Sequence, residues 1–176
     1  AEVASTCNEA LLMNYLLESC KNDKDDKRRK YLLNHYFEQF KGTLFRQTMF
    51  AEFERTTHAM VEAGEPLTVQ AFKTVYRGLL ERYFGPDFAL DNELSLECLR
   101  IPHFYRSFYV YKYATGLSAA IALSQRVLTG GVKELNDYLT FLKSGCSKFP
   151  LDLLRDAGVD MASPMPVDTA LTHFSQ

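Results

Sequence analysis

The chain has 176 residues, of which 47% are hydrophobic and 24% are charged, ordinary values for a globular protein with a core of its own. Its 20 Lys and Arg residues nearly balance its 22 Asp and Glu residues, and a formal net charge of -2 argues against nucleic acid as a partner. It contains no apolar run of about eighteen residues, so no membrane span is expected, and its four cysteines form no Cys-x-x-Cys metal pair, so reduced cytosolic thiols are expected.

Helical periodicity runs through the chain, and no alternating strand of useful length is present. The pattern predicts a first helix over residues 2–20 and a turn over residues 23–27. A long second helix is predicted over residues 26–62, where apolar residues recur at helical spacings. Gly42 lies inside that helix at a cost of about 1 kcal/mol relative to Ala, which predicts close helix packing around it.

The second half of the chain also reads as helices separated by Gly and Pro. Thr68 is predicted to cap a helix that ends before Gly85. The later helices are predicted over residues 91–99, 104–129, 132–143, 150–157 and 166–175. Together these elements predict an all-α helical bundle, either a single domain over residues 1–176 or a fragment of one.

Glu2 is the first candidate for a chemical role. It shares one face of the first predicted helix with Ser5, Thr6 and Glu9, at spacings of three, four and seven residues. The opposite face is apolar, so the residues alone favour a solvated polar face. Elsewhere His35, His58 and His173 are isolated on helices and are interpreted as structural, because none has a second metal-type ligand four residues away.

The second candidate is the segment that begins at His103. Tyr105, Tyr109 and Tyr113 follow at intervals of four, which would place three phenols along one side of the helix predicted over residues 104–129. Imidazole and phenol groups can donate hydrogen bonds to charge that develops on a carbonyl oxygen. Spacing alone favours an aromatic packing stripe, although buried phenols each need a partner.

Several strings in order along the whole chain resemble the oligoendopeptidase F family. They are AEVAST (1–6), NEALL (8–12), FRQTMFAEFE (45–54), YFGP (83–86), IPHFY (101–105), YVYKYATG (109–116), LKSG (142–145) and AGVDM (157–161). Members of this family are relatives of thimet oligopeptidase and are cytosolic zinc endopeptidases that cut short peptides. The resemblance therefore implies the C-terminal part of a larger zincin-type, all-helical catalytic domain.

The resemblance also implies roles for particular residues. In the family, two histidines of a His-Glu-x-x-His motif and a later glutamate bind zinc, and Glu2 matches that glutamate. His103 matches a histidine that binds the substrate and the tetrahedral intermediate. Tyr109 is the best match for the tyrosine that stabilises the oxyanion, while Tyr105 and Tyr113 are weaker matches for substrate-binding positions.

The chain departs from the family in containing no His-Glu-x-x-His motif. The helical pattern starts at the first residue without a cap, which suggests a cut inside a longer chain. The resemblance then implies that the two zinc histidines and the general-base glutamate lie upstream of Ala1. We therefore expect a zinc metalloendopeptidase whose C-terminal fragment alone is inactive and does not retain zinc. The alternative is a non-catalytic helical module that binds peptides, and a purely structural domain would bury Tyr105, Tyr109 and Tyr113 completely.

Two further expectations follow from the fragment interpretation. Glu2 should face a cleft that it shares with His103 and Tyr109, because a metal ligand and oxyanion donors must surround one reacting carbonyl group. Apolar surface covered in the longer protein should be exposed in this chain, and it should promote self-association.

Overall fold

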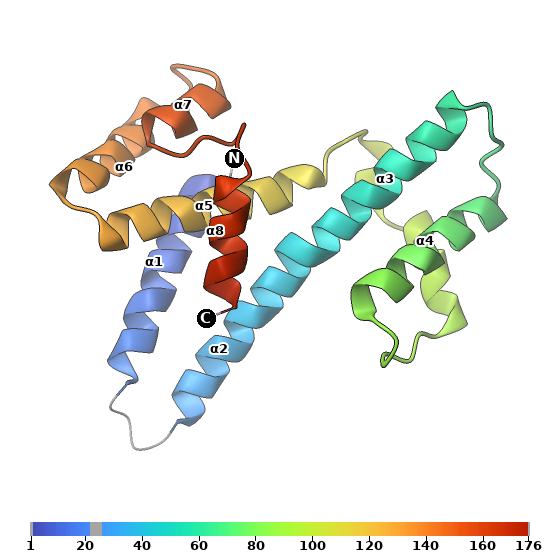
Figure 1. Cartoon of the computed structure of the whole chain (residues 1–176), viewed down its shortest axis with the longest axis horizontal. Helices are drawn as coiled ribbons and strands as arrows, with labels where there is room; N and C mark the ends of the chain where they lie inside the picture. The colour runs from blue at the N-terminus through green and yellow to red at the C-terminus, as the bar shows by residue number, and fades with distance from the viewer. Residues whose placement is uncertain (1, 22–25, 176) are drawn as a thin grey trace. The chain divides into compact units, whose positions relative to one another are not determined.

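The structure, a computed structural model, describes residues 2–21 and 26–175, and all regular structure within them is helical (Figure 1). The predicted all-α class is confirmed. Most of the turn predicted over residues 23–27 lies outside the described residues. The elements are α1 (Val3–Ser19), α2 (Lys27–Phe40), the π-helical turn η1 (Lys41–Phe45), α3 (Arg46–Glu62), α4 (Val69–Phe84), the 3-10 helices η2 (Asn92–Leu99) and η3 (Pro102–Tyr105), α5 (Tyr111–Thr129), α6 (Val132–Ser144), α7 (Pro150–Asp156) and α8 (Met165–Phe174).

Packing divides the chain into two compact units. The first comprises residues 1–44 and 115–176, and the second comprises residues 45–114. Each unit has a hydrophobic core of its own. The assignment of residues 1–176 to one domain stays a prediction.

The core of the first unit is built around α5, whose residues 117–124 are all buried. Three of these residues are alanine, and small side chains allow neighbouring helices to approach closely. Cys7 of α1, Tyr138 of α6 and Leu154 of α7 pack in the same cluster. Burial of one such Leu side chain stabilises the fold by about 1.5–3 kcal/mol, so these contacts dock three helices on α5.

Aromatic side chains join α8 to α2 within the same unit. The ring of His173 lies 5.8 Å from that of Tyr36, and the ring of Phe174 lies 5.1 Å from that of Phe40. Burial lowers the pKa of His173, which favours the neutral imidazole. The side chain therefore has the packing role expected for it.

The core of the second unit is mainly aromatic. Phe50 and Phe53 of α3 contact Tyr76 of α4 and Phe104 of η3, with ring centroids 5.1 to 6.3 Å apart. Edge-to-face and offset ring pairs of this kind add about 0.5–1.5 kcal/mol beyond the burial of their area. They hold the short helix η3 against the middle of α3.

A polar cluster around Glu97 fastens η2 to the same two helices. The Glu97 side chain is 10% exposed, and its Oε1 atom lies 2.5 Å from Arg46 Nη2 and 2.9 Å from Arg100 Nη2. Tyr76 donates its hydroxyl hydrogen to Glu97 Oε2 over 2.6 Å, and burial is the main reason that the pKa of this phenol is raised. Because η2 directly precedes the segment with the candidate residues, this cluster fixes where that segment starts.

The long helix predicted over residues 26–62 is continuous but not uniform. Its α-helical parts α2 and α3 are separated by the π-helical turn η1, which contains Gly42. The prediction of close packing at Gly42 is wrong, because a Cβ atom added there would meet no atom within 4 Å. Gly42 instead lies where the helix changes from α-helical to π-helical geometry.

The helix predicted over residues 104–129 is wrong in its first part. Residues 102–105 form the 3-10 helix η3, and α5 begins only at Tyr111. Between them Phe108 adopts a φ of 54°, the only positive φ of a non-glycine residue among the described residues. The intervals of four between the tyrosines fit a helix, but contacts with α3 impose a turn.

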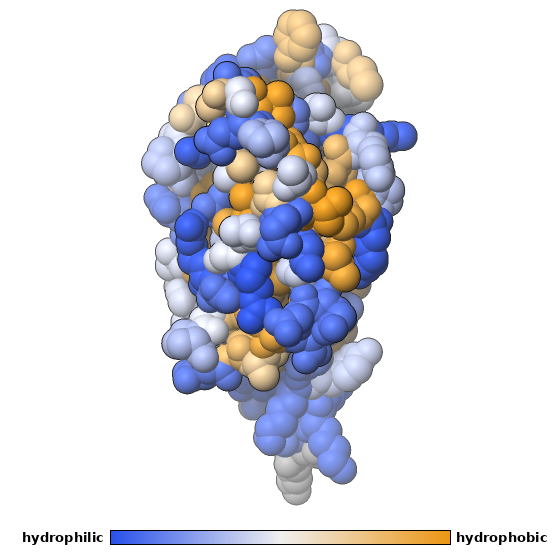
Figure 2. All heavy atoms as spheres, turned by 90° about the vertical axis from the view of Figure 1, so that its right-hand side faces the viewer, coloured by the Kyte–Doolittle hydropathy of each residue, from blue (hydrophilic) through white to orange (hydrophobic). Residues whose placement is uncertain are grey.

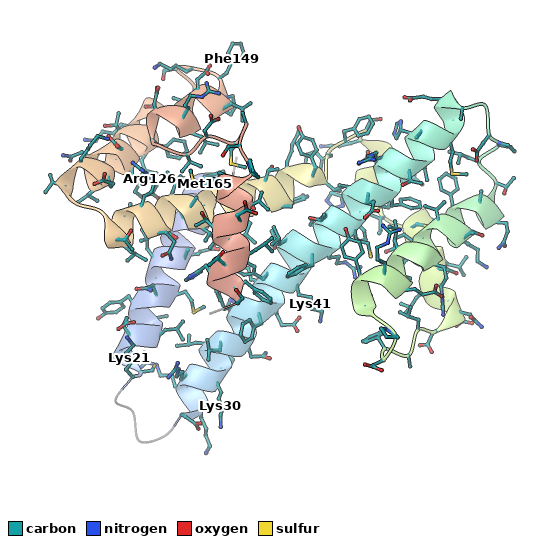
Figure 3. All side chains as sticks on the ribbon, viewed as in Figure 1. Lys21, Lys30, Lys41, Arg126, Phe149 and Met165 are labelled. Atoms are coloured by element: carbon teal, nitrogen blue, oxygen red, sulfur yellow. The ribbon has the colours of Figure 1, made fainter. Side chains whose placement is uncertain are left out.

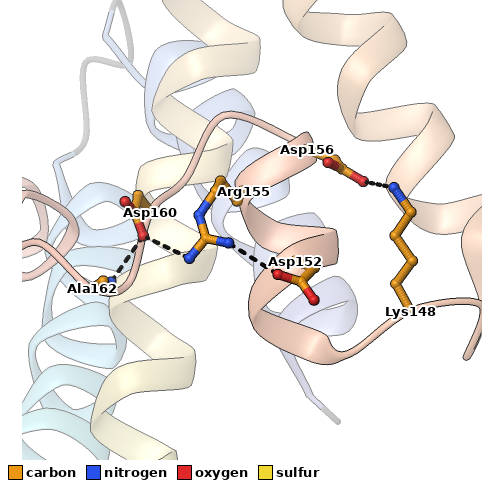
Figure 4. A network of polar contacts seen from close by, with 6 residues as sticks. All are labelled: Lys148, Asp152, Arg155, Asp156, Asp160 and Ala162. Carbon is orange, nitrogen blue, oxygen red and sulfur yellow. Dashed lines mark hydrogen bonds and ion pairs between the residues drawn. The ribbon is translucent and has the colours of Figure 1, made fainter.

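Residues 148–160, which follow α6, are organised by ion pairs (Figure 4) and by a glycine cap. Arg155 bridges Asp152 at 3.0 Å and Asp160 at 3.6 Å, while Lys148 pairs with Asp156 at 2.6 Å. These pairs are exposed and each contributes little. The turn that follows α7 depends on Gly158, which has a φ of 83°.

The surface retains many apolar side chains. Figure 2 shows apolar residues that interrupt the hydrophilic surface in several places. Phe149, at the start of α7, is 80% exposed (Figure 3), and Val132 at the start of α6 is 77% exposed. Among the described helices, none is both long and apolar enough to cross a membrane.

The contact of Gly158 with Arg126, whose side chain is labelled in Figure 3, leads to a first prediction. A Cβ atom at Gly158 would collide with the Arg126 guanidinium group, which also lies 3.5 Å from Asp137. Gly158→Ala should therefore lower the free energy of unfolding by about 1–2 kcal/mol for the left-handed backbone, and by a smaller further amount for displacement of the Arg126 guanidinium group. Urea denaturation followed by circular dichroism measures both.

Gly64 provides a matched control. Gly64 and Gly158 each follow a helix with the same pair of closing hydrogen bonds and with φ values of 80° and 83°. A Cβ atom at Gly64 would meet nothing within 4 Å, so Gly64→Ala should show the backbone cost alone. Equal losses in the two variants would contradict the prediction, as would a failure of Arg126→Ala to reduce the cost of Gly158→Ala.

The four cysteines differ sharply in accessibility. Cys7, Cys20 and Cys98 are buried, whereas Cys146 is exposed, and all four are free thiols. Burial is the main cause that raises the pKa of Cys7 and Cys98, so thiolate is disfavoured in both. Three of the thiols thus lack the access that a nucleophile or redox sensor needs.

A thiol reagent used at about pH 8 should therefore modify one site rapidly. We expect Cys146 to react in the folded chain and the three buried thiols to react only after denaturation. Because their folded-state pKa is raised, a higher pH should accelerate Cys7 and Cys98 only above the range in which an ordinary thiol ionises. Cys146→Ser should abolish the fast phase, and a second fast thiol in that variant would disprove the assignment.

Candidate functional site

Glu2 lies at the start of α1 with its side chain exposed. The hydroxyl of Ser5 donates to the Glu2 carbonyl oxygen over 3.0 Å and lies 3.5 Å from Glu2 Oε2. Other side chains of the first unit hold this end of the helix in place. The Tyr138 hydroxyl of α6 donates to Asn8 Oδ1 over 2.9 Å and lies 3.3 Å from the carbonyl oxygen of Ala4. The helix that carries Glu2 is therefore anchored one turn away from the carboxylate.

His103, Tyr109 and Tyr113 form a cluster in the second unit. The ring centroid of His103 lies 5.8 Å from that of Tyr109 and 6.0 Å from that of Tyr113, and the two tyrosine rings are 5.6 Å apart. The Tyr113 hydroxyl and His103 Nε2 are 3.4 Å apart. His103 is exposed, and Tyr109 and Tyr113 are half-buried. An imidazole and two phenols thus gather as hydrogen-bond donors that solvent can reach.

Tyr105 does not join this cluster. Its side chain is 83% exposed, and it lies beside a pocket formed with α3 and η2. The predicted row of three tyrosines along one helix is therefore wrong, because Tyr105 belongs to η3 and precedes the turn at Phe108. The purely structural interpretation required buried tyrosines, and the exposure of Tyr105 does not fit it.

The turn that separates Tyr105 from Tyr109 is fixed by two side chains of α3. The backbone N–H of Phe108 donates to Oε1 of Glu54, and the ring of Phe108 lies 4.5 Å from that of His58. A left-handed conformation costs a residue with a side chain about 1–2 kcal/mol. The two contacts from α3 offset this cost, so the turn is imposed by the second unit rather than by local preference.

The pocket beside Tyr105 has a volume of about 460 Å³. Most of its lining residues are apolar, among them the aromatic Phe53, Phe72 and Phe104. Glu54 and His58 are two of its polar lining residues. The size falls within the range of small-ligand sites, and the mixture of apolar wall and few polar groups is typical of them.

The described residues do not make a metal site on their own. No group of three His, Cys, Asp or Glu side chains within residues 2–21 and 26–175 could hold an ion. Glu2 is a suitable oxygen ligand, but a zinc site needs three or four protein ligands. The residues present therefore do not fit zinc unless ligands come from outside this chain.

Glu54 is the functional candidate that the sequence interpretation missed. It lies four residues after Phe50 and one after Phe53, which places a carboxylate on the apolar face of α3. A charged residue on a buried helical face is a recognisable signal, since burial of an unpaired charge is costly. The partner, a backbone N–H 54 residues further along the chain, leaves no pattern in the sequence.

Comparison with known proteins defines the class. The model of peptidase family M3 matches residues 1–173, and the chain belongs to this family. The match confirms the resemblance seen in the sequence motifs, since the relatives are oligoendopeptidases of the F type.

The relatives match nearly the whole chain. It is 52% identical to oligopeptidase PepF of Bacillus subtilis over 100% of its own length and 26% of that protein. It is 44% identical to group B oligopeptidase PepB of Streptococcus agalactiae, again over its full length and 29% of the relative. The crystal structure of oligoendopeptidase-F from Enterococcus faecium superposes with a TM-score of 0.93 at 45% identity, over 99% of this chain and 33% of the other. The chain thus spans about a quarter to a third of the proteins that it matches.

Proposed function

We propose that this chain is the C-terminal part of a zinc metalloendopeptidase that cleaves short peptides. The observation that carries the proposal is the cluster of His103, Tyr109 and Tyr113, which gathers three donors at the positions that resemble the substrate-binding segment of the oligoendopeptidase F family. Membership of peptidase family M3 supports the same activity. We propose the cytoplasm as its location, because the resemblance to the oligoendopeptidase F family implies it.

Each residue of the cluster has a distinct role in this proposal. His103 and Tyr109 would donate hydrogen bonds to the carbonyl oxygen of the scissile peptide as negative charge develops on it. Removal of one donor of this kind typically lowers kcat by about 10²–10³-fold. Tyr113 would orient the His103 ring through its hydroxyl and contact substrate, and Tyr105 would bind substrate beside the pocket.

Glu2 would supply one carboxylate ligand to zinc, with the remaining ligands outside this chain. A bound zinc ion would provide a Lewis acid and an activated water. We further propose that Glu2 shares a cleft with His103 and Tyr109, because all three must act on the same peptide bond. That Glu2 lies close to the cluster of His103 and Tyr109 stays a prediction.

A non-catalytic peptide-binding module is the second candidate. The pocket lined by Phe53, Phe72 and Phe104 favours it, because such a pocket binds a side chain without any chemistry. The two proposals differ in what they require of the longer protein. Only the peptidase needs the His-Glu-x-x-His motif and a Glu2 carboxylate.

The isolated chain should therefore neither retain zinc nor hydrolyse peptides. One carboxylate cannot replace the three or four converging ligands from which zinc sites derive an apparent binding energy of about 10–16 kcal/mol. Without a positioned base the water would also lose a contribution of about 10²–10⁴-fold. The test is dialysis against zinc, measurement of bound metal, and an assay with a quenched fluorescent peptide.

Addition of a fragment that carries the His-Glu-x-x-His helix should restore both properties. Glu2→Ala should then abolish them, whereas Glu9→Ala, on the same helix, should leave both intact. Tyr109→Phe should lower kcat and leave zinc binding unchanged. Stoichiometric zinc on the chain alone, or hydrolysis without the added fragment that Glu2→Ala abolishes, would disprove the proposal that the site is divided.

We also propose that the isolated chain self-associates through exposed apolar side chains. Phe149, Val132 and Leu151 are 80%, 77% and 56% exposed at the start of α6 and α7. Sedimentation velocity over a range of concentrations should show mass increasing with concentration. Phe149→Ser combined with Val132→Ser should reduce the effect, and a monomer at every concentration that binds no hydrophobic dye would contradict the proposal.

A further inference from the structure

Glu54 is a buried acid whose hydrogen bond serves a turn rather than an ion pair. The residue is 4% exposed, and Oε1 accepts the backbone N–H of Phe108. Within the described part of the chain, no Lys or Arg forms an ion pair with Glu54. A buried carboxylate is costly unless its hydrogen bonds compensate, so the contact with Phe108 is the main feature that explains an acid at this position.

The turn that Glu54 holds is one that the local sequence disfavours. Phe108 has a φ of 54°, a conformation in which a bulky residue is an outlier. Strained residues persist only where the surroundings impose them, and they concentrate at functional sites. Here the carboxylate of Glu54 fixes the N–H, and the ring of His58 packs on the side chain.

The strained turn at Phe108 lies between the candidate residues and so determines whether they meet. His103 precedes Phe108, and Tyr109 and Tyr113 follow it. A continuous helix would place His103 and Tyr113 ten residues apart along its axis, about 15 Å. With the chain reversed at Phe108, the Tyr113 hydroxyl and the His103 ring nitrogen are 3.4 Å apart.

We propose that Glu54 is a positioning residue that assembles the His103–Tyr109–Tyr113 cluster by fixing the turn at Phe108. The role rests on the proposed function as far as catalysis is concerned. The assembly of the cluster itself is independent of that function and can be measured without activity.

The first experiment uses the chain as it is. The His103 ring centroid lies 5.8 Å and 6.0 Å from the centroids of two tyrosine rings, so ring currents should displace its carbon-bound proton resonances, which His103→Gln identifies among the four histidines. Glu54→Met, which preserves length but removes the acceptor, should move the His103 resonance toward the value of an unstructured histidine. Glu54→Gln retains an acceptor oxygen and should leave most of the displacement.

Glu52 provides the matched control. It also lies on α3 and makes a comparable tertiary contact, since it accepts the Tyr83 hydroxyl over 3.1 Å and pairs with Arg82. Neither partner belongs to the turn, so Glu52→Met should leave the His103 resonance in place. Phe108→Gly should recover part of the displacement in the Glu54→Met background, because glycine adopts a positive φ without strain.

The second experiment measures steady-state kinetics in the full-length protein that contains this chain. Glu54→Met should lower kcat at least about tenfold, with a smaller change in KM, because displaced donors lose their alignment with the transition state. Glu54→Gln should recover most of kcat, and Glu52→Met should resemble the wild type.

The outcomes separate the two proposals. An unmoved His103 resonance in Glu54→Met, or an equal shift in Glu52→Met, would overturn the positioning role. A shifted resonance with unchanged kcat would overturn its importance for catalysis. If the wild-type full-length protein cleaves no peptide, the proposed function fails, and the resonance comparison still decides whether Glu54 assembles the cluster.

Discussion

The reversal of the chain at Phe108 is the constraint on which the candidate site depends. A helix through this segment would satisfy the backbone hydrogen bonds locally, but it would spread the imidazole and the phenols along its axis. The hydrogen bond to Glu54 and the ring contact with His58 compensate for a strained backbone and so make the turn the stable alternative. The arrangement of the three donors in the second unit therefore depends on α3, which contributes none of them.

Two different kinds of support hold the candidate residues. The cluster of His103 and the tyrosines is supported by a buried carboxylate and an aromatic core in which Phe50, Phe53 and Phe104 are in contact. Glu2 instead depends on Tyr138, a neutral hydroxyl that donates to α1. Substitutions in the two supports should thus affect separate properties, which under the proposed function are metal ligation in one case and oxyanion stabilisation in the other.

The sequence predicted the helices well where caps and breakers marked them. Thr68 accepts a hydrogen bond from the Ala71 N–H over 3.1 Å as an N-cap, and Gly85 ends the same helix with a φ of 80°. It failed at Phe108, because the contacts that impose the turn come from residues about fifty positions earlier. Motif resemblance singled out His103 and Tyr109, whose rings lie 5.8 Å apart, and their roles stay predictions. Helical spacing placed Tyr105 wrongly in one row with Tyr109 and Tyr113.

The anchoring of α1 by Tyr138 has a consequence for how the protein is made. The Tyr138 hydroxyl and Asn8 are separated by 130 residues of chain, and the first unit is assembled from segments on both sides of the second. During synthesis, residues 45–114 can close their own core while α1 has α2 beside it but still lacks α5 and α6, which emerge later. Within this chain, the helix that carries Glu2 thus leaves the ribosome before the second unit and is docked by Tyr138 only after it. Chaperones that shield exposed apolar faces would have α1, with Cys7 and Leu11 uncovered, as a substrate throughout that interval.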